Sequence, residues 1–296
     1  MLCIDIFKEI FNNLNIKHQI YLLQVNKCFN ENLHIINFYD IEDKYIRKLN
    51  EGILINYEQL QQLNIKMNNN NITNLNYLTN LKKLNATKKK YLTDHGIKNL
   101  NLTKLIIDKN WNIKNISHMT NLKVLHCRGY SQVTDEDIKN LNLEKLMASR
   151  NSKIKNINHM TSLKVLDCST EYPDYGVTDE NIKNLNLIEL YAHENKGIKN
   201  ISYMTNLKIL GCGMNSNIDD DDIKNLDLIE LHMFLNYNIK KISHLTNLKA
   251  LDCDNSDIEY DDIKNLDLVE LCTDCKSIID NKHHFTSLRT INGIQI

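Results

Sequence analysis

The sequence predicts an α/β solenoid in which short parallel strands recur along the chain and are joined by loops and short helices. Three observations support this prediction. From Leu60 to the C-terminus, leucines recur at intervals of 20 to 24 residues. Each begins an L-x-x-L-x-L pattern or a close variant, which is typical of one short strand per unit. Two kinds of unit alternate, so the repeat has an internal order of its own.

The first leucines of the units stay in register over the whole segment. They are Leu60, Leu81, Leu102, Leu122, Leu143, Leu163, Leu187, Leu207, Leu228, Leu248, Leu268 and Leu288. A period near 20 with this motif is the signature of leucine-rich repeats. A single match would be weak evidence, but matches that stay in register over the whole segment are strong evidence. We expect about twelve repeats over residues 60–296, whose strands pair in parallel and line the concave face of a horseshoe.

The first kind of unit, the Asn-type unit, carries an asparagine eight residues after its first leucine. The members of this series are Asn68, Asn110, Asn151, Asn195 and Asn236. A buried amide at this position can bond backbone groups of the adjacent turn that would otherwise lack partners. Lys276 takes the place of the asparagine in the last unit of this kind. We therefore expect an atypical, capping C-terminal end.

The second kind of unit, the Cys-type unit, carries cysteine five residues after its first leucine in four cases. These cysteines are Cys127, Cys168, Cys212 and Cys253. Members two repeats apart would be about 10 Å distant, too far for a disulfide, so we expect small buried side chains in a reduced intracellular protein. The pairs Thr93-Asp94, Thr134-Asp135 and Thr178-Asp179 follow in these units and predict short helices on the convex side.

The chain before Leu60 does not follow the repeat. Residues 1–33 contain apolar side chains at helical spacing, which predict two or three short amphipathic helices with too little apolar surface for a core of their own. Residues 34–59 are interpreted as a helical linker and N-terminal cap, although Leu33, Ile36 and Phe38 could begin a degenerate repeat.

Residues 1–33 resemble an F-box. The family pattern is roughly L-P-x-E, an apolar residue, then I-F-x-x-L, a turn, and apolar residues ending in V-C/N-K-x-aromatic. The matching residues, which the resemblance implies bind an adaptor, are Leu2, Ile6, Ile10, Phe11, Leu14, Leu23, Val25 and Phe29. Asp5, Leu22, Asn26 and Lys27 also fit the pattern, whereas Cys3 stands where the family has proline.

An F-box followed by leucine-rich repeats is an architecture of substrate receptors in ubiquitin ligases. The resemblance therefore implies a substrate-recognition adaptor of an SCF-type ligase, which binds a Skp1-like adaptor, through it a cullin, and a protein substrate. The sequence style also resembles F-box and repeat proteins encoded by giant DNA viruses of amoebae, which implies the host cytoplasm. The alternative is a non-catalytic protein-binding scaffold unrelated to ubiquitin, in which the N-terminal helices serve only as a cap.

The concave face offers candidate substrate-binding residues in its middle part. Strand alternation directs positions two, four and six after each first leucine to this face. Large side chains gather there, namely Met147, Tyr191, His193, His232 and Phe234. Charges on the same face change from basic (Lys83, Lys104) to acidic (Glu230, Glu270) along the chain. We interpret the patch as a protein-binding hot spot, with scattered surface side chains as the alternative.

Other chemistry receives little support from the sequence. Cys272-x-x-Cys275 has zinc-like spacing, but the adjacent His283 and His284 do not, and both cysteines fall on repeat positions. The run Asp219–Asp222 aligns with the helix starts of sister units, so helix N-terminal charge explains it. We expect no enzyme activity, metal or cofactor. The net charge of −1 and the lack of a long apolar run predict neither nucleic-acid binding nor a membrane span. We further expect a monomer in the cytoplasm.

Overall fold

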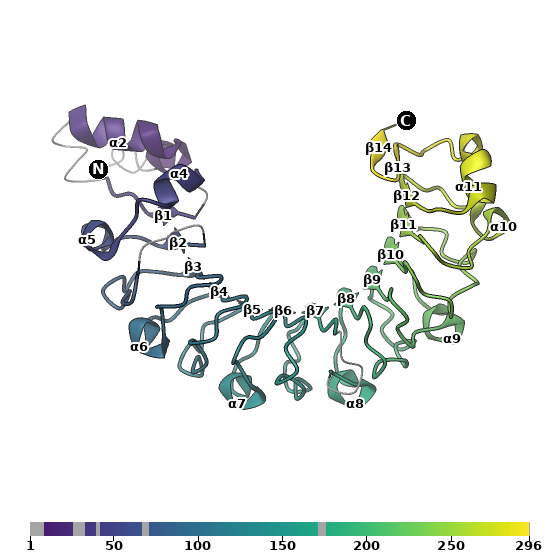
Figure 1. Ribbon diagram of the computed structural model, residues 1–296, viewed down its shortest axis with the longest axis horizontal. Coiled ribbons are helices and arrows are strands. Elements are labelled where there is room, and N and C mark those ends of the chain that lie inside the picture. Colours follow the sequence, from purple (N-terminus) through teal and green to yellow (C-terminus); the bar gives the residue numbers. More distant parts are fainter. Residues whose placement is uncertain (1–8, 26–32, 40–41, 67–70, 171–175, 296) are drawn as a thin grey trace. The chain divides into compact units, whose positions relative to one another are not determined.

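The computed structural model describes residues 9–25, 33–39, 42–66, 71–170 and 176–295. The chain divides into two compact units, residues 1–141 and 142–296, and each is described by itself. In each unit, short strands lie along one side and short helices along the other (Figure 1). The strand side corresponds to the predicted binding face and is called the strand face below.

The first unit begins with two helical segments, residues 9–13 and α2 (Ile16–Val25). Its strands are β1 (Asn37–Phe38), β2 (Gln62–Asn64), β3 (Lys83–Asn85), β4 (Lys104–Ile106) and β5 (Val124–His126). Its further helices are α4 (Asp43–Ile46), α5 (Glu51–Leu54), α6 (Asp94–Ile97) and α7 (Asp135–Ile138). The strands pair in parallel in chain order, so successive repeats are neighbours in the sheet.

The second unit continues the same pattern. Its strands are β6 (Lys145–Met147), β7 (Val165–Asp167), β8 (Glu189–Tyr191), β9 (Ile209–Gly211), β10 (Glu230–His232), β11 (Ala250–Asp252), β12 (Glu270–Cys272), β13 (Thr290–Ile291) and β14 (Ile294–Gln295). Its helices are α8 (Asp179–Ile182), α9 (Asp220–Ile223), α10 (Tyr260–Ile263), α11 (Lys276–Asp280) and the 3₁₀ turn η1 (Lys282–His284). Strands β6 to β13 pair in parallel, and β14 folds back antiparallel on β13.

The predicted leucine-rich-repeat solenoid is confirmed strand by strand. Every strand from β2 to β13 begins two residues after one of the predicted first leucines. Leu63 of β2 pairs with Leu84 of β3, and Leu190 of β8 pairs with Leu210 of β9, so the central leucines stack along the sheet. These leucines are fully buried. The core is therefore a row of leucine layers between the strands and the helix side.

Residues 34–59 form more than a helical linker. Asn37 and Phe38 of β1 pair in parallel with Gln62 and Leu63 of β2, so the sheet begins one unit before Leu60. The predicted degenerate repeat is the better description of this segment. Its two helices, α4 and α5, are only four residues long each. The leucine pattern did not identify this segment, because β1 has Phe38 at the position where later strands have their central leucine.

Helices occur where the Cys-type units predict them. α6 to α9 each begin after the predicted Thr or Asp, and α10 begins after Glu259. Four of these five helices carry a capping box between the N-cap residue and the third helical residue. The first helical carboxylate also bonds the next repeat. Asp179, for example, accepts hydrogen bonds from the backbone N–H groups of Lys199 and Asn200 at 3.0 and 3.1 Å. Consecutive repeats are thus tied on the helix side as well as through the sheet.

The asparagine series also acts as predicted. The Asn195 side chain donates to the carbonyl of Val177 at 3.0 Å and accepts from the N–H of Gly197 at 2.8 Å. Asn110, Asn195 and Asn236 are almost completely buried, whereas Asn68 lies outside the described residues. Where Lys276 interrupts the series, the chain forms α11 in place of the usual turn. The atypical C-terminal end expected from this substitution is present.

Candidate functional site

The strand face of the second unit carries most of the predicted substrate-binding side chains. Tyr191 of β8 and His232 of β10 both pair with Gly211 of β9, so they flank one glycine in adjacent strands. His193 and Phe234 lie two residues further along the same face. All four large side chains are half-buried, with one surface packed and the other open. We call Tyr191, His193, His232 and Phe234 the ring cluster.

Two glycines between these residues make room for the rings. A β-carbon on Gly211 would lie 2.6 Å from Nε2 of His193 and 3.0 Å from a ring carbon of Tyr191. A β-carbon on Gly213 would lie 2.5 Å from the Phe234 carbonyl oxygen and 2.9 Å from its ring. The rings of the neighbouring repeats therefore lie directly against the bare backbone of the β9 unit. Any larger residue there would lift them off the sheet.

His193 is fixed at the centre of the ring cluster. Its Nδ1 accepts a hydrogen bond from the N–H of Gly213 at 3.0 Å, and its ring centroid lies 5.3 Å from that of Phe234. Burial lowers the pKa of His193, and nearby His232 lowers it further, against an opposing effect of Asp252. Both the accepted bond and the lowered pKa favour the neutral imidazole at pH 7. His193 therefore acts as an uncharged ring.

Carboxylates surround the ring cluster. Glu189 and Glu230 occupy the first face position of β8 and β10, and Asp252 pairs with His232 across β10 and β11. Burial raises the pKa of Tyr191, and the charges of Glu189, Glu230 and Asp167 raise it further. A raised phenol pKa is what a negative local potential produces. From β8 to β12, no lysine or arginine stands at positions two, four or six after the first leucine.

Met147 lies apart from the ring cluster. It is only 7 % exposed, and Asp167 of β7 stands between it and Tyr191 in the sheet register. Strand alternation correctly predicts its face but not its accessibility. The structure thus brings together four of the five predicted substrate-binding residues and leaves Met147 in the packed layer.

The strand face of the first unit has a different character. Lys83 and Lys104 pair across β3 and β4 at the first face position. The Lys104 ammonium lies 5.3 Å from the ring centroid of Tyr39, within cation–π range. A guanidinium nitrogen of Arg128 lies 3.9 Å from a carboxylate oxygen of Asp108. The face is basic at the first position of β3 and β4, as the sequence predicts. The guanidinium of Arg128, in contrast, already lies near the carboxylate of Asp108.

The N-terminal helices place the predicted adaptor-binding residues in unequal positions. Phe11 is 2 % exposed, Leu14 and Leu23 are half-buried, and Ile10 is 50 % exposed. Leu2, Ile6, Phe29 and the side chain of Val25 lie outside the described residues, as do Cys3 and Asp5. Phe11 therefore belongs to a packed interior, and the accessible apolar surface lies elsewhere. Ile20 and Tyr21 of α2, exposed by 40 % and 62 %, contribute to it.

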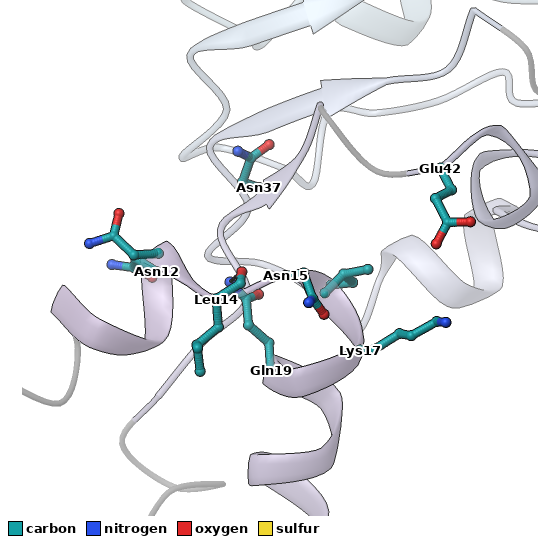
Figure 2. Close-up of a pocket in the computed structure, with 9 residues that line it drawn as sticks. Asn12, Leu14, Asn15, Lys17, Gln19, Asn37 and Glu42 are labelled. Atoms are coloured by element: carbon teal, nitrogen blue, oxygen red, sulfur yellow. Dashed lines mark hydrogen bonds between the residues drawn. The ribbon is translucent and has the colours of Figure 1, made fainter.

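A buried glutamine joins the two N-terminal helical segments. The Gln19 amide donates to the carbonyls of Phe11 and Leu14 at 2.9 and 3.0 Å, which pairs backbone groups at the end of the first segment. Beside it lies a pocket of about 470 Å³ (Figure 2). Its lining is rich in amides and includes Asn12, Asn13, Leu14, Asn15, Ile16, Lys17, Gln19, Asn37 and Glu42. The helices and Asn37, at the start of the sheet, thus line the same pocket.

The cysteines have the roles expected of small buried side chains. In the described part of the chain, Cys127, Cys168, Cys212 and Cys253 form no disulfide and are at most 4 % exposed. Burial raises the pKa of Cys212 to about 12, so its thiol is neutral and unreactive. Cys275 instead contacts the Ser277 hydroxyl at 3.3 Å and a Glu259 carboxylate oxygen at 3.7 Å. Among the described residues, no three His, Cys, Asp or Glu side chains are grouped so as to hold a metal ion.

The aspartate run Asp219–Asp222 forms a helix start. Asp219 is the N-cap of α9, and its carboxylate accepts from the N–H groups of Asp221 and Asp222 at 2.9 and 3.3 Å. The backbone N–H of Asp219 in turn donates to the Asp222 carboxylate at 3.0 Å. These bonds account for the run as a capping box. In the described part of the chain, no helix has the length and apolar character that crossing a bilayer requires.

Sequence reasoning missed the two glycines at the centre of the ring cluster. Gly211 and Gly213 occupy two face positions of one unit in a chain with only eight glycines. Glycine in a strand often marks a place where another group approaches the backbone closely. A search for glycines at the face positions of the repeats would therefore have located the centre of the ring cluster. The acidic charges around the patch were expected from the sequence, where Glu189 and Glu230 stand two residues before Tyr191 and His232.

Comparison with known proteins supports the fold alone. No family model matches the chain, and no curated protein matches its sequence. Among solved structures, an internalin (inlF) from Listeria monocytogenes is similar, with 23 % identity, coverage of 84 % of this chain and 78 % of that chain, and a TM-score of 0.58. The fold is that of leucine-rich-repeat proteins.

Two further structures are similar over long stretches. A chain of the Rad7 and Elc1 complex from yeast shares 16 % identity, with coverage of 99 % of this chain and 92 % of that chain and a TM-score of 0.51. The functional domain of InlJ from Listeria monocytogenes, which includes a cysteine ladder, shares 20 % identity at a TM-score of 0.50. That match covers 80 % of this chain and 58 % of InlJ. At these identities, similarity reports the solenoid and not its partners.

Proposed function

We propose that this protein is a non-catalytic recognition adaptor that connects a protein substrate to an SCF-type ubiquitin ligase. The strand face of the second unit holds the substrate, and the N-terminal helices dock a Skp1-like adaptor and through it a cullin. The observation that carries the proposal is the ring cluster, an open group of aromatic side chains on a rigid sheet. Aromatic groups with a packed base and an accessible face are typical of protein-binding hot spots.

The N-terminal helices support the second half of the proposal. Phe11 is buried, whereas Ile10, Ile20 and Tyr21 expose apolar surface to solvent. Such surface on helices whose inner side is already packed favours a contact with another protein. The F-box resemblance of residues 1–33 supports an adaptor of the Skp1 type as that protein. The similarity to a chain of the Rad7 and Elc1 complex is compatible with an adaptor-bound solenoid.

The alternative role for the N-terminal helices is that of a cap only. The burial of Phe11 and the hydrogen bonds of Gln19 favour a structural contribution to the first unit. A cap would cover the exposed end of the sheet at β1, as terminal repeats require. The two roles differ in one respect, because only an adaptor-docking segment needs the exposed residues Ile10 and Tyr21.

Binding of purified Skp1 to the full chain separates these roles. We expect Skp1 to bind, and Ile10→Glu with Tyr21→Glu to abolish binding while the circular dichroism spectrum stays unchanged. Tyr237→Glu, on another exposed tyrosine of the second unit, is the matched control and should bind normally. If Skp1 does not bind the full chain, or binds the double variant equally well, the ligase role is wrong. Phe11→Ala should lower the stability of the first unit by about 3 kcal/mol under either role.

A further inference from the structure

The chemistry of the strand face in the second unit indicates which partner it accepts. Six carboxylates stand at face positions of β8 to β12 or just after them, namely Glu189, Glu230, Asp252, Asp254, Glu270 and Asp274. None of them has a lysine or arginine beside it at the face positions of these strands. By contrast, Lys208 and Lys249 reach Asp227 and Asp267, which lie outside the face positions. On this face, Nε2 of His232 lies 3.6 Å from a carboxylate oxygen of Glu230. The face therefore carries negative charge that no lysine or arginine at its face positions offsets.

We propose that this face binds an extended basic segment of a partner protein, with one arginine or lysine side chain seated on the ring cluster. This inference rests on the proposed role of the face in substrate recognition and adds the chemical class of the substrate. A partner that covers six carboxylates must supply positive charge, because desolvated charges without partners cost a great deal. An acidic peptide or a nucleic acid would meet repulsion here.

The ring cluster is suited to a cation rather than to an apolar side chain. Cations bind over aromatic faces through the ring quadrupole, and guanidinium groups also stack on them. Tyr191, His193 and Phe234 present ring surface around the bare backbone of Gly211 and Gly213. The acceptor role of His193 Nδ1 keeps this ring neutral, so it does not repel a bound cation. The carboxylates of Glu189 and Glu230 stand next to the rings, on the strands that carry Tyr191 and His232.

The spacing of the strands matches an extended chain. Glu189 and Glu230 lie on β8 and β10, two strands apart, which is about 10 Å at normal sheet spacing. Residues three apart in an extended segment are separated by a similar distance, and alternate residues by about 7 Å. The long stems of arginine and lysine cover the difference. A segment that crosses the strands can therefore place two cations on the two glutamates and a third on the rings between them.

Fluorescence anisotropy with a labelled peptide of alternating arginine and glycine tests the proposal on the full chain. We expect saturable binding that weakens with added salt, and no binding of the matched peptide with glutamate in place of arginine. Glu189→Gln with Glu230→Gln should weaken binding at least tenfold. The control Glu136→Gln with Glu180→Gln removes the same charge from exposed residues on the helices and should change binding less than twofold. Equal losses in the two double variants would overturn the proposal.

A second pair of variants tests the rings themselves. Tyr191→Leu with Phe234→Leu keeps apolar bulk but removes the aromatic faces, and we expect at least a fivefold loss of arginine-peptide binding. Circular dichroism and thermal unfolding establish that this variant is folded. Unchanged binding by the folded variant would contradict the seat on the rings. Because Skp1 binding depends on the other end of the chain, failure of the peptide test leaves the ligase role standing, and failure of Skp1 binding leaves the peptide result standing.

Discussion

The strand faces of the two units differ in their side chains, although the two units share one repeat pattern of buried leucines and asparagines. We call this buried pattern the frame. In the first unit, Lys83 and Lys104 are paired neighbours at the first face position of β3 and β4. In the second unit, β6 still has Lys145 there, but Glu189 and Glu230 take that position on β8 and β10, beside the ring cluster. Beneath both faces the same leucine layer is fully buried. The difference indicates that packing determines the frame, whereas the charge and size of the face residues can change from repeat to repeat.

The comparison follows from the geometry of the repeat. In β4 and β8 the central leucine is buried and its two neighbours are half-buried on the face, so the core constrains the central position most. In other strands the third position is packed as well, as at Met147 and Gly211. Hydrogen bonds of the sheet use backbone groups alone and do not depend on the face residues. A face residue can therefore change charge or size with little effect on folding. Changes in the frame should instead damage either unit to a similar extent.

The largest effect is expected from removal of a frame asparagine in either unit. Asn236→Ala leaves the carbonyl of Ile218 and the N–H groups of Asn238 and Ile239 without their side-chain partner. Asn110→Ala does the same to the carbonyl of Lys89 and the N–H groups of Asn112 and Ile113. Each unpaired buried group costs roughly 1 kcal/mol or more, so we expect a loss of about 3 kcal/mol in both variants.

Urea unfolding measures whether Asn236→Ala and Asn110→Ala lower stability by the same amount. The sole tryptophan, Trp111, follows Asn110 directly, so its fluorescence reports the first unit while circular dichroism reports the whole chain. Asn247→Ala is the control, because this exposed amide bonds only the exposed carboxylate of Asp227 among the bonds described and should matter little. A loss in one unit but not in the other would show that the two frames are not equivalent.

The frame was predictable from sequence because buried leucines repeat strictly, and the face was predictable only in part. The intervals after Leu60 fix the positions of β2 to β13. They did not reveal β1, because Phe38 replaces leucine there, or the burial of Met147, which depends on its neighbours. The packing role of Gly211 was also hidden, since a residue without a side chain gives no direct sign of what covers it. Phe11 matched a family motif, but a motif does not tell which of its residues faces inward.

The second largest effect is expected at Gly96, where the first unit departs from the second. Gly96 is the third residue of α6, a position that holds Asp222 in α9 and Asn181 in α8. A β-carbon on Gly96 would lie 2.0 Å from the carbonyl oxygen of Thr73 in the preceding repeat. Alanine normally stabilises a helix relative to glycine, but here the backbone must move. We expect Gly96→Ala to lower stability by about 2 kcal/mol.

Gly52 provides the matched control for this substitution. It lies in α5 of the same unit, and a β-carbon there would meet only the Asn50 side chain at 3.3 Å. Gly52→Ala should therefore leave the urea midpoint unchanged or raise it slightly. If Gly96→Ala is equally harmless, the close approach of α6 to the preceding repeat is not maintained in solution.

The smallest effect is expected at Asp222, the counterpart of Gly96 in the second unit. Burial raises the pKa of Asp222 to about 6, the N–H of Asp219 lowers it, and the charges of Asp219 and Asp179 raise it. Because the folded-state pKa lies above that of the unfolded chain, the folded protein holds this proton more tightly. The contribution to stability is therefore present below about pH 4 and is lost as the pH rises through about 6.

Asp222→Asn should remove this pH dependence without loss of the helix cap. Asn181 shows that an amide serves at this position, since its Oδ1 accepts from the N–H of Thr178 at 2.8 Å. At pH 7 the variant avoids a partly desolvated charge, so we expect it to be more stable than the natural chain by about 1 kcal/mol. The two proteins should converge near pH 4, where Asp222 is protonated. Parallel stability curves between pH 4 and pH 7 would show that Asp222 titrates normally and is not desolvated in the second unit.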